Sequence, residues 1–252
     1  MVRSGLCDYR IYVLSLRERL IYGLAAAIMC ALISYTFFRS LYIFFILAAV
    51  GVIFYPEYKK HELMEKRKRR LSGQFKEAIE ILSSFLSAGY SVENAFRNST
   101  GELITLFGKD AMIVREFRHI SDSISMNKPV ERLLYEFAER SGTDDIRNFS
   151  EIFAAAKRTG GELGSIIEHT TEIIRERINV AEEINNLTAS QRYQQRIMNM
   201  LPFMIILYID FTSRGFFDAM YQTVLGKVVM TVCLGLYLSA IVMSEKILDI
   251  RI

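Results

Sequence analysis

Apolar residues along the chain form four long runs and, between the second and third runs, short stripes with helical spacing. The first two runs are continuous from Leu20 to Tyr55, where Arg39 is the one charged residue. A single helix of this length would extend roughly 54 Å, whereas the hydrocarbon core of a bilayer is about 30 Å thick. We therefore predict two membrane-spanning helices that fold back at Arg39 and Ser40.

Two further apolar runs, Met198–Ser213 and Val228–Ser244, predict a second membrane hairpin. Pro202 is expected to kink the helix where it enters the membrane. Asp210 is a carboxylate within the third run, which makes it either a functional group or the partner of Arg214, one helical turn further along. The alternative for all four runs is burial in the core of a helical protein.

Lys and Arg residues beside these runs are concentrated on one side. They are frequent before the first run, between the second and third runs, and at both ends of the second hairpin. Because cytoplasmic loops carry the excess of Lys and Arg, both termini and the middle segment are predicted to be cytoplasmic. This pattern predicts a multi-pass protein of the cytoplasmic (inner) membrane.

The middle segment has apolar residues every three or four positions, which predicts amphipathic helices. Corners between these helices are predicted at Gly89, at Asn127 and Pro129, and at Gly160 and Gly161. The predicted fold is therefore an all-α integral membrane protein with four transmembrane helices and a cytoplasmic antiparallel six-helix bundle. The expected core stripes are Phe75, Ile79, Leu82 and Leu86; Ile113, Phe117, Ile120 and Ile124; Leu133, Leu134 and Phe137; Ile146, Phe149, Ile152 and Phe153; and Leu163, Ile166, Ile167, Thr170, Ile173, Ile174, Ile178 and Ala181.

The predicted domain boundaries follow from these patterns. No helix breaker occurs from Glu162 to about Met200, which predicts one continuous helix through which motion of the bundle could reach the third span. The segments are a cytoplasmic tail at 1–19, a transmembrane hairpin at 20–55, a basic juxtamembrane segment at 56–70, the helical bundle at 71–196, a second transmembrane hairpin at 197–244 and a cytoplasmic tail at 245–252.

Charge is distributed unevenly between these segments. The whole chain carries a formal charge of +3, whereas Leu71–Ser190 contains 13 Lys and Arg against 19 Asp and Glu, a net charge of −6. An acidic bundle is poorly suited to bind nucleic acid. The basic run is predicted instead to contact anionic lipid or a protein partner. It consists of Lys66, Arg67, Lys68, Arg69 and Arg70.

Candidate catalytic and ligand-binding patterns are weak. A phosphate-binding loop follows a strand and places its lysine after the glycines, whereas Lys157 precedes Gly160 and Gly161 within a helical segment. The single pair of Glu116 and His119 lacks the second copy that a di-iron bundle requires. The three cysteines have neither zinc spacing nor a disulfide framework. We expect no catalytic residue, no metal and no cofactor, and hence a protein that is not an enzyme.

Three stretches give the chain a resemblance to a known family. They are ILSSFLSAGYSVENAF at Ile81–Phe96, KPVERLLYEFAERSG at Lys128–Gly142, and IFAAAKRTGGELGSIIEHTTEIIRERI. With Pro202 opening the next membrane helix, this pattern resembles the type II secretion system F-domain family. More narrowly, it resembles the TadB/TadC-type inner-membrane proteins of Tad (Flp) pilus assembly, from Leu71 to about Ser244. The pattern departs at Asn127, where the family usually has glycine and where asparagine still tolerates a left-handed conformation.

The resemblance implies a non-enzymatic platform protein of a Tad, type II secretion or type IV pilus-like machine. Such a protein contacts a hexameric secretion ATPase and couples its motion to the assembly of pilin subunits. A paralogous F-domain membrane protein, membrane lipid and a homo- or hetero-oligomer are also implied. An archaellum-like or other type IV filament system is the nearest alternative. A small membrane transporter and a membrane-anchored signalling bundle are alternatives from other classes, although the spans contain few ionisable residues.

Overall fold

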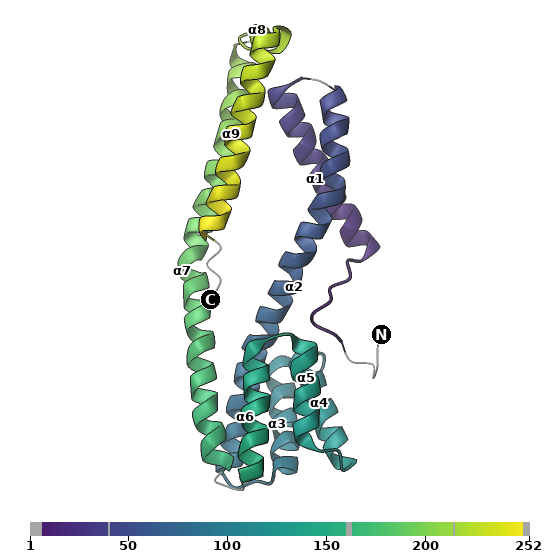
Figure 1. Ribbon diagram of the computed structural model, residues 1–252, viewed down its shortest axis with the longest axis vertical. Coiled ribbons are helices and arrows are strands. Elements are labelled where there is room, and N and C mark those ends of the chain that lie inside the picture. The colour runs from purple at the N-terminus through teal and green to yellow at the C-terminus, as the bar shows by residue number, and fades with distance from the viewer. Residues whose placement is uncertain (1–6, 40, 160–162, 214, 249–252) are drawn as a thin grey trace. The chain divides into compact units, whose positions relative to one another are not determined.

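The structure, a computed structural model, describes residues 7–39, 41–159, 163–213 and 215–248. In these residues every regular element is an α-helix, which confirms the predicted all-α class (Figure 1). The helices of the described residues are α1 (Leu16–Phe37), α2 (Leu41–Ser87), α3 (Val92–Phe107), α4 (Met112–Ser125), α5 (Val130–Ser141), α6 (Asp144–Thr159), α7 (Leu163–Thr212), α8 (Asp218–Gln222) and α9 (Val224–Leu248).

The described residues divide into two compact units. The bundle unit consists of the residues up to Val13 together with His61–Val180. The hairpin unit consists of Leu14–Lys60 together with the described residues from Ala181 onward. The helices α2 and α7 contribute residues to both units. Compared with the predicted bundle at 71–196, the bundle unit starts and ends earlier along α2 and α7, and it includes residues of the N-terminal tail.

One hydrophobic core fills the bundle unit, with buried residues from α2 to α7. Helical spacing explains the set, because positions three and four apart lie on one face of a helix. The predicted stripe residues of α2, α4 and α5 are all buried. Phe75 of α2 is fully buried, and its ring centroid lies 6.2 Å from that of Phe137 and 5.5 Å from that of Phe149. The sequence pattern therefore predicted most of this core.

Three isoleucines that were predicted in the core are exposed instead, so these assignments were wrong. They are Ile152 of α6, and Ile166 and Ile173 of α7. The neighbours Ile167 and Ile174 are buried. Successive residues of a helix point about 100° apart, so where the buried face of a helix is narrow only one residue of an adjacent pair faces the core, here Ile167 and Ile174 of α7 and Phe153 of α6. The apolar stripe of α7 is therefore narrower than the sequence pattern indicated.

In the hairpin unit, α1 lies against the first part of α2. Gly51 permits this close approach, because a Cβ atom at position 51 would lie 2.8 Å from the Cys30 Sγ atom of α1. The rings of Tyr22 and Tyr55 meet edge to face, with centroids 6.5 Å apart. A small second core, built on Phe37 with residues of α7 and α9, joins this hairpin to the other helices of the unit.

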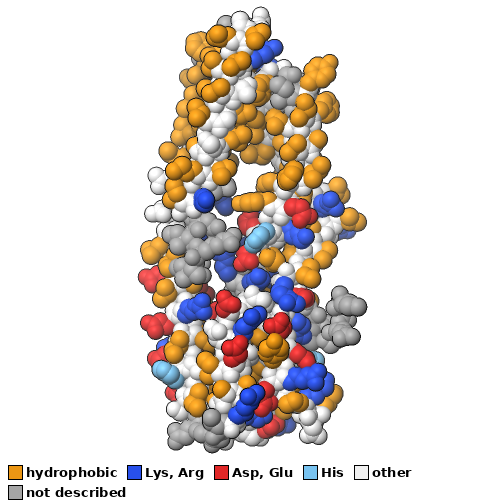
Figure 2. Space-filling view, viewed as in Figure 1, with side chains coloured by type: hydrophobic (Ala, Val, Ile, Leu, Met, Phe, Trp, Pro, Cys, Tyr) orange, Lys and Arg blue, Asp and Glu red, His pale blue; other side chains and the backbone are white. Residues whose placement is uncertain are grey.

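Two helices of the described residues are long and apolar enough to cross a membrane, Leu16–Phe37 and Val224–Ser244. The surface of the hairpin unit is largely hydrophobic, whereas charged side chains are spread over the bundle unit (Figure 2). The other two predicted spans are parts of α2 and α7, which continue as helices into charged sequence. The four-span topology stays a prediction.

Candidate functional site

The predicted corners use the residues expected of them where the structure describes them. Gly89 follows α2 with a φ angle of +84°, and Asn127 has a φ angle of +62° between α4 and α5. Both angles lie in the left-handed region that Gly and Asn tolerate. Pro129 is the N-cap residue of α5, immediately before its first turn. Gly160 and Gly161 lie outside the described residues.

The helix α7 is continuous from Leu163 to Thr212, which confirms the predicted continuity for the described residues. At 1.5 Å per residue, its 50 residues extend roughly 75 Å. Pro202 lies inside this helix, where a proline lacks the N–H that would bond to the preceding turn. The kink at Pro202 stays a prediction.

The basic run lies on α2, where the helix directs its five side chains to different sides. Lys66, Arg69 and Arg70 are exposed, whereas Arg67 and Lys68 are half-buried. The guanidinium of Arg67 lies 5.0 Å from the ring centroid of Tyr9, as a cation–π contact. Part of the predicted lipid- or partner-binding run therefore holds the chain's own N-terminal segment.

Tyr9 attaches this N-terminal segment to the bundle unit. Its side chain is 2% exposed, and its hydroxyl donates a hydrogen bond to Oε1 of Glu116 at 3.1 Å. The Tyr9 N–H donates to the Arg140 carbonyl oxygen at 2.9 Å. The Arg140 guanidinium forms an ion pair with the second carboxylate oxygen of Glu116. We call this arrangement of Tyr9, Arg67, Glu116 and Arg140 the Tyr9 anchor; it joins α2, α4 and α5 to the N-terminal segment.

The electrostatics of the Tyr9 anchor suit a structural role. Burial raises the pKa of Glu116, while the charge of Arg140 and the two hydrogen bonds act in the opposite direction. Burial and the negative charge of Glu116 raise the pKa of Tyr9, so the phenol remains a hydrogen-bond donor. Burial and then the charge of Arg140 lower the pKa of His119, one helical turn from Glu116. The hydrogen bonds and the ion pair to the buried Glu116 hold Tyr9 and Arg140 in one geometry.

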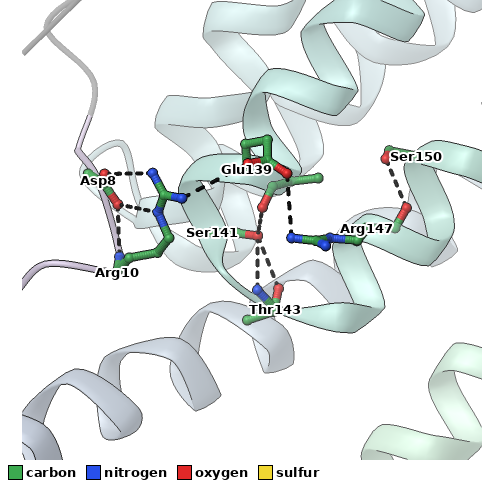
Figure 3. Close-up of polar contacts among 8 residues, drawn as sticks. Asp8, Arg10, Glu139, Ser141, Thr143, Arg147 and Ser150 are labelled. Atoms are coloured by element: carbon green, nitrogen blue, oxygen red, sulfur yellow. Dashed lines mark hydrogen bonds and ion pairs between the residues drawn. The ribbon is translucent and has the colours of Figure 1, made fainter.

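The residues next to Tyr9 in the N-terminal segment form ion pairs with the bundle surface, and Figure 3 shows the pairs around Glu139. Arg10 pairs with Asp8 at 3.2 Å and lies 4.0 Å from Glu139 of α5, and Arg147 of α6 lies 3.4 Å from the same Glu139. The hydrogen bond from Arg10 lowers the pKa of Asp8. Exposed ion pairs of this kind contribute only about 0–1 kcal/mol each. The buried Tyr9 therefore contributes more than the network to holding the segment.

Asp210 forms its ion pair within the hairpin unit, with Arg39 from the turn after α1. The Arg39 Nη2 atom lies 2.8 Å and 2.7 Å from the two carboxylate oxygens of Asp210. The rings of Tyr35 and Tyr221 lie 5.7 Å and 5.3 Å from the guanidinium carbon. Among the described residues, Asp210 pairs with Arg39. Arg214, the expected partner, lies outside the described residues.

We expect the substitutions Arg39→Gln and Asp210→Asn to be non-additive. Either one removes the ion pair, so the double variant should be about as stable as the less stable single variant. The coupling energy should be about 1 kcal/mol, because the pair is partly exposed. Thermal unfolding of the natural chain, the two single variants and the double variant in detergent micelles measures this coupling. Lys227→Gln, at an exposed lysine, is the control. Fully additive losses would show that the pair does not hold the two hairpins together.

Two open grooves border α6. The groove between α6 and α7 has a volume of about 310 Å³ and is lined by Ile152 and Ile173, among others. In it, Arg177 lies 3.2 Å from Asp145, and burial raises the pKa of Asp145. The groove between α5 and α6, next to Tyr135, has a volume of about 440 Å³. Both are surface features of the bundle unit.

The described residues contain no candidate metal site, and comparisons with known proteins supply no relative. In the part of the chain that the structure describes, no three His, Cys, Asp or Glu side chains gather closely enough to hold a metal ion. Comparisons of the chain with family models, with curated proteins and with solved structures find no match. The resemblance to the F-domain family therefore depends on the sequence stretches alone.

Proposed function

We propose that the chain is a non-enzymatic platform protein of a Tad, type II secretion or type IV pilus-like machine. It couples a hexameric secretion ATPase in the cytoplasm to the assembly of pilin subunits, beside a paralogous F-domain membrane protein. The observation that carries the proposal is the single helix α7, which contributes to the bundle unit and, without a break, to the apolar hairpin unit. The kind of machine is inferred from the resemblance of Ile81–Phe96 and the two later stretches to the F-domain family.

The hairpin unit supports a membrane location. The helices α1 and α9 are apolar and carry many exposed aliphatic side chains, which lipid would cover. Tyr42, Phe211 and Phe216 are exposed beside the turns that follow the first and third predicted spans. Aromatic residues are enriched at membrane–water interfaces. Four spans, with both termini in the cytoplasm, are the topology that we propose.

The path of force follows from the stiffness of a helix. A displacement of the bundle unit by the ATPase is carried along α7, which is helical from Leu163 to Thr212. The same holds for α2, which is helical from Leu41 to Ser87. Two continuous helices therefore carry motion towards the membrane, and no chemistry on the chain itself is needed.

Recovery of partners tests the proposal. The full chain, carrying a C-terminal tag, is cross-linked in its native cells and purified from membranes, and the recovered proteins are quantified by mass spectrometry. We expect a secretion ATPase and an F-domain paralogue to be enriched at least tenfold over an unrelated membrane protein with the same tag. Absence of both after cross-linking would contradict the platform function.

Interruption of α7 tests the coupling separately. Asn186 is exposed in the middle of α7. A proline there removes one backbone hydrogen bond and destabilises the helix by about 3 kcal/mol. We expect Asn186→Pro to abolish filament assembly while the ATPase is still recovered, and Asn186→Ala to preserve both. Assembly at the normal level by Asn186→Pro would show that α7 does not transmit the motion.

A further inference from the structure

Two exposed isoleucines line the groove between α6 and α7, and no other described part of the bundle unit covers them. Ile152 of α6 lines one side and Ile173 of α7, 55% exposed, lines the other. Thr170 and the buried Ile174, both of α7, also line it. Apolar side chains in this arrangement gain stability when a partner removes them from water.

The shape of the groove suits a helix. Its lining residues recur every three or four positions along α6, from Asp145 to Ile152, and along α7, from Thr170 to Arg177. Side chains at this spacing form ridges on a helix surface. Two neighbouring ridges leave a channel into which the ridge of a third helix packs. The groove is therefore shaped for a helical segment of about two turns.

The borders of the groove are negatively charged. Asp145 and Arg177 neutralise one another across it. Among the ion pairs of the described residues, none involves Glu151, which lines the groove, or Glu176, one turn from Ile173. The surrounding segment Leu71–Ser190 is acidic as a whole, with 13 Lys and Arg against 19 Asp and Glu. Unneutralised carboxylates beside an apolar wall select a partner that carries positive charge.

We propose that the groove between α6 and α7 binds an amphipathic helix of a partner protein, whose apolar ridge is flanked by Lys or Arg. An anionic lipid surface is repelled by Glu151 and Glu176. A second copy of the chain, presenting the same face, brings the same carboxylates together. The proposal depends on the chemistry of the groove alone and holds for either outcome of the partner-recovery experiment.

A designed peptide tests the proposal. The probe is a labelled helical peptide with leucine at every third or fourth position and lysines on either side. The full chain is reconstituted in nanodiscs of zwitterionic lipid, and binding is measured by fluorescence anisotropy. We expect Ile173→Asp to weaken binding at least tenfold and Leu106→Asp to leave it unchanged. Leu106 is a matched control, because it is 56% exposed on α3 of the same unit, and both substitutions leave the core intact.

Exchange of charge gives a second readout. A peptide with glutamates in place of the lysines should bind the natural chain poorly and bind the variant Glu151→Lys/Glu176→Lys at least tenfold more tightly. Equal losses for Ile173→Asp and Leu106→Asp would show that binding does not depend on the groove and would overturn the proposal. Loss with Tyr135→Asp but not with Ile173→Asp would move the site to the other groove of α6 and overturn it. Absence of binding by the natural chain would also overturn it.

Discussion

Substitution of Arg140 by Met is expected to destabilise the bundle unit by about 3–5 kcal/mol, because it leaves the Glu116 carboxylate buried without a cation. Glu116 is fully buried, and its two oxygens bond to Tyr9 and Arg140. The Tyr9 hydroxyl still donates one hydrogen bond in the variant, but it does not neutralise the charge. Urea titration of the full chain in detergent micelles, followed by far-UV circular dichroism, measures the change in the free energy of unfolding.

The destabilisation by Arg140→Met should depend on pH. The pKa of Glu116 is already raised by burial, and loss of Arg140 removes a charge that lowers it. A carboxyl group whose folded pKa is raised stabilises the fold below its unfolded pKa, and this stability is lost as the pH rises through the folded pKa. Compared with the natural chain at the same pH, the variant should therefore lose more stability at about pH 8 than at about pH 4.

Two further variants control this interpretation. Arg147→Met is the same exchange at an exposed arginine, which pairs with Glu139, and it should cost less than about 1 kcal/mol. The double variant Glu116→Met/Arg140→Met replaces the buried pair by apolar groups and should recover much of the loss. If the double variant were as unstable as Arg140→Met, the uncompensated charge would not be the cause.

Local sequence patterns predicted the bundle core well, for a physical reason. Positions three and four apart share one helix face whatever the rest of the chain does. Phe75, Phe117 and Phe137 are therefore buried as expected. The same rule is ambiguous where two apolar residues are adjacent, since spacing alone does not decide whether Ile173 or Ile174 faces the core. The exposed member of that pair lines the groove that we propose as a binding surface.

The polar contacts could not be predicted from local pattern, because they join distant parts of the chain. Tyr9 and Glu116 are 107 positions apart, and Arg39 and Asp210 are 171 positions apart. Proximity along the helix favoured Arg214 for Asp210, but no local pattern pointed to Arg39, which pairs with Asp210 in the described residues. One local signal was present: Glu116 lies on the buried face of α4, where a carboxylate requires a partner. Its two partners, Arg140 of α5 and Tyr9 of the N-terminal segment, are set by how these segments pack against α4.

Removal of the Phe75 ring is the second change with a large expected effect. Phe75→Ala should destabilise the bundle unit by about 3–5 kcal/mol, because it empties the space between the rings of Phe137 and Phe149. These two rings belong to α5 and α6, so the cavity weakens the contact of both helices with α2. The same urea titration measures the loss.

The size of the cavity should set the size of the loss. Phe75→Leu retains part of the volume and should cost less than Phe75→Ala, because destabilisation increases with the cavity that remains. Tyr135→Ala removes an aromatic ring that is 55% exposed in the same unit, and it should change stability by no more than about 0.5 kcal/mol. If Phe75→Ala were as mild as Tyr135→Ala, Phe75 would not be a core residue. Phe75 and the basic run both lie on α2. A mild effect of Phe75→Ala would therefore mean that this part of the core does not fix α2, and with it the basic run, to the bundle unit.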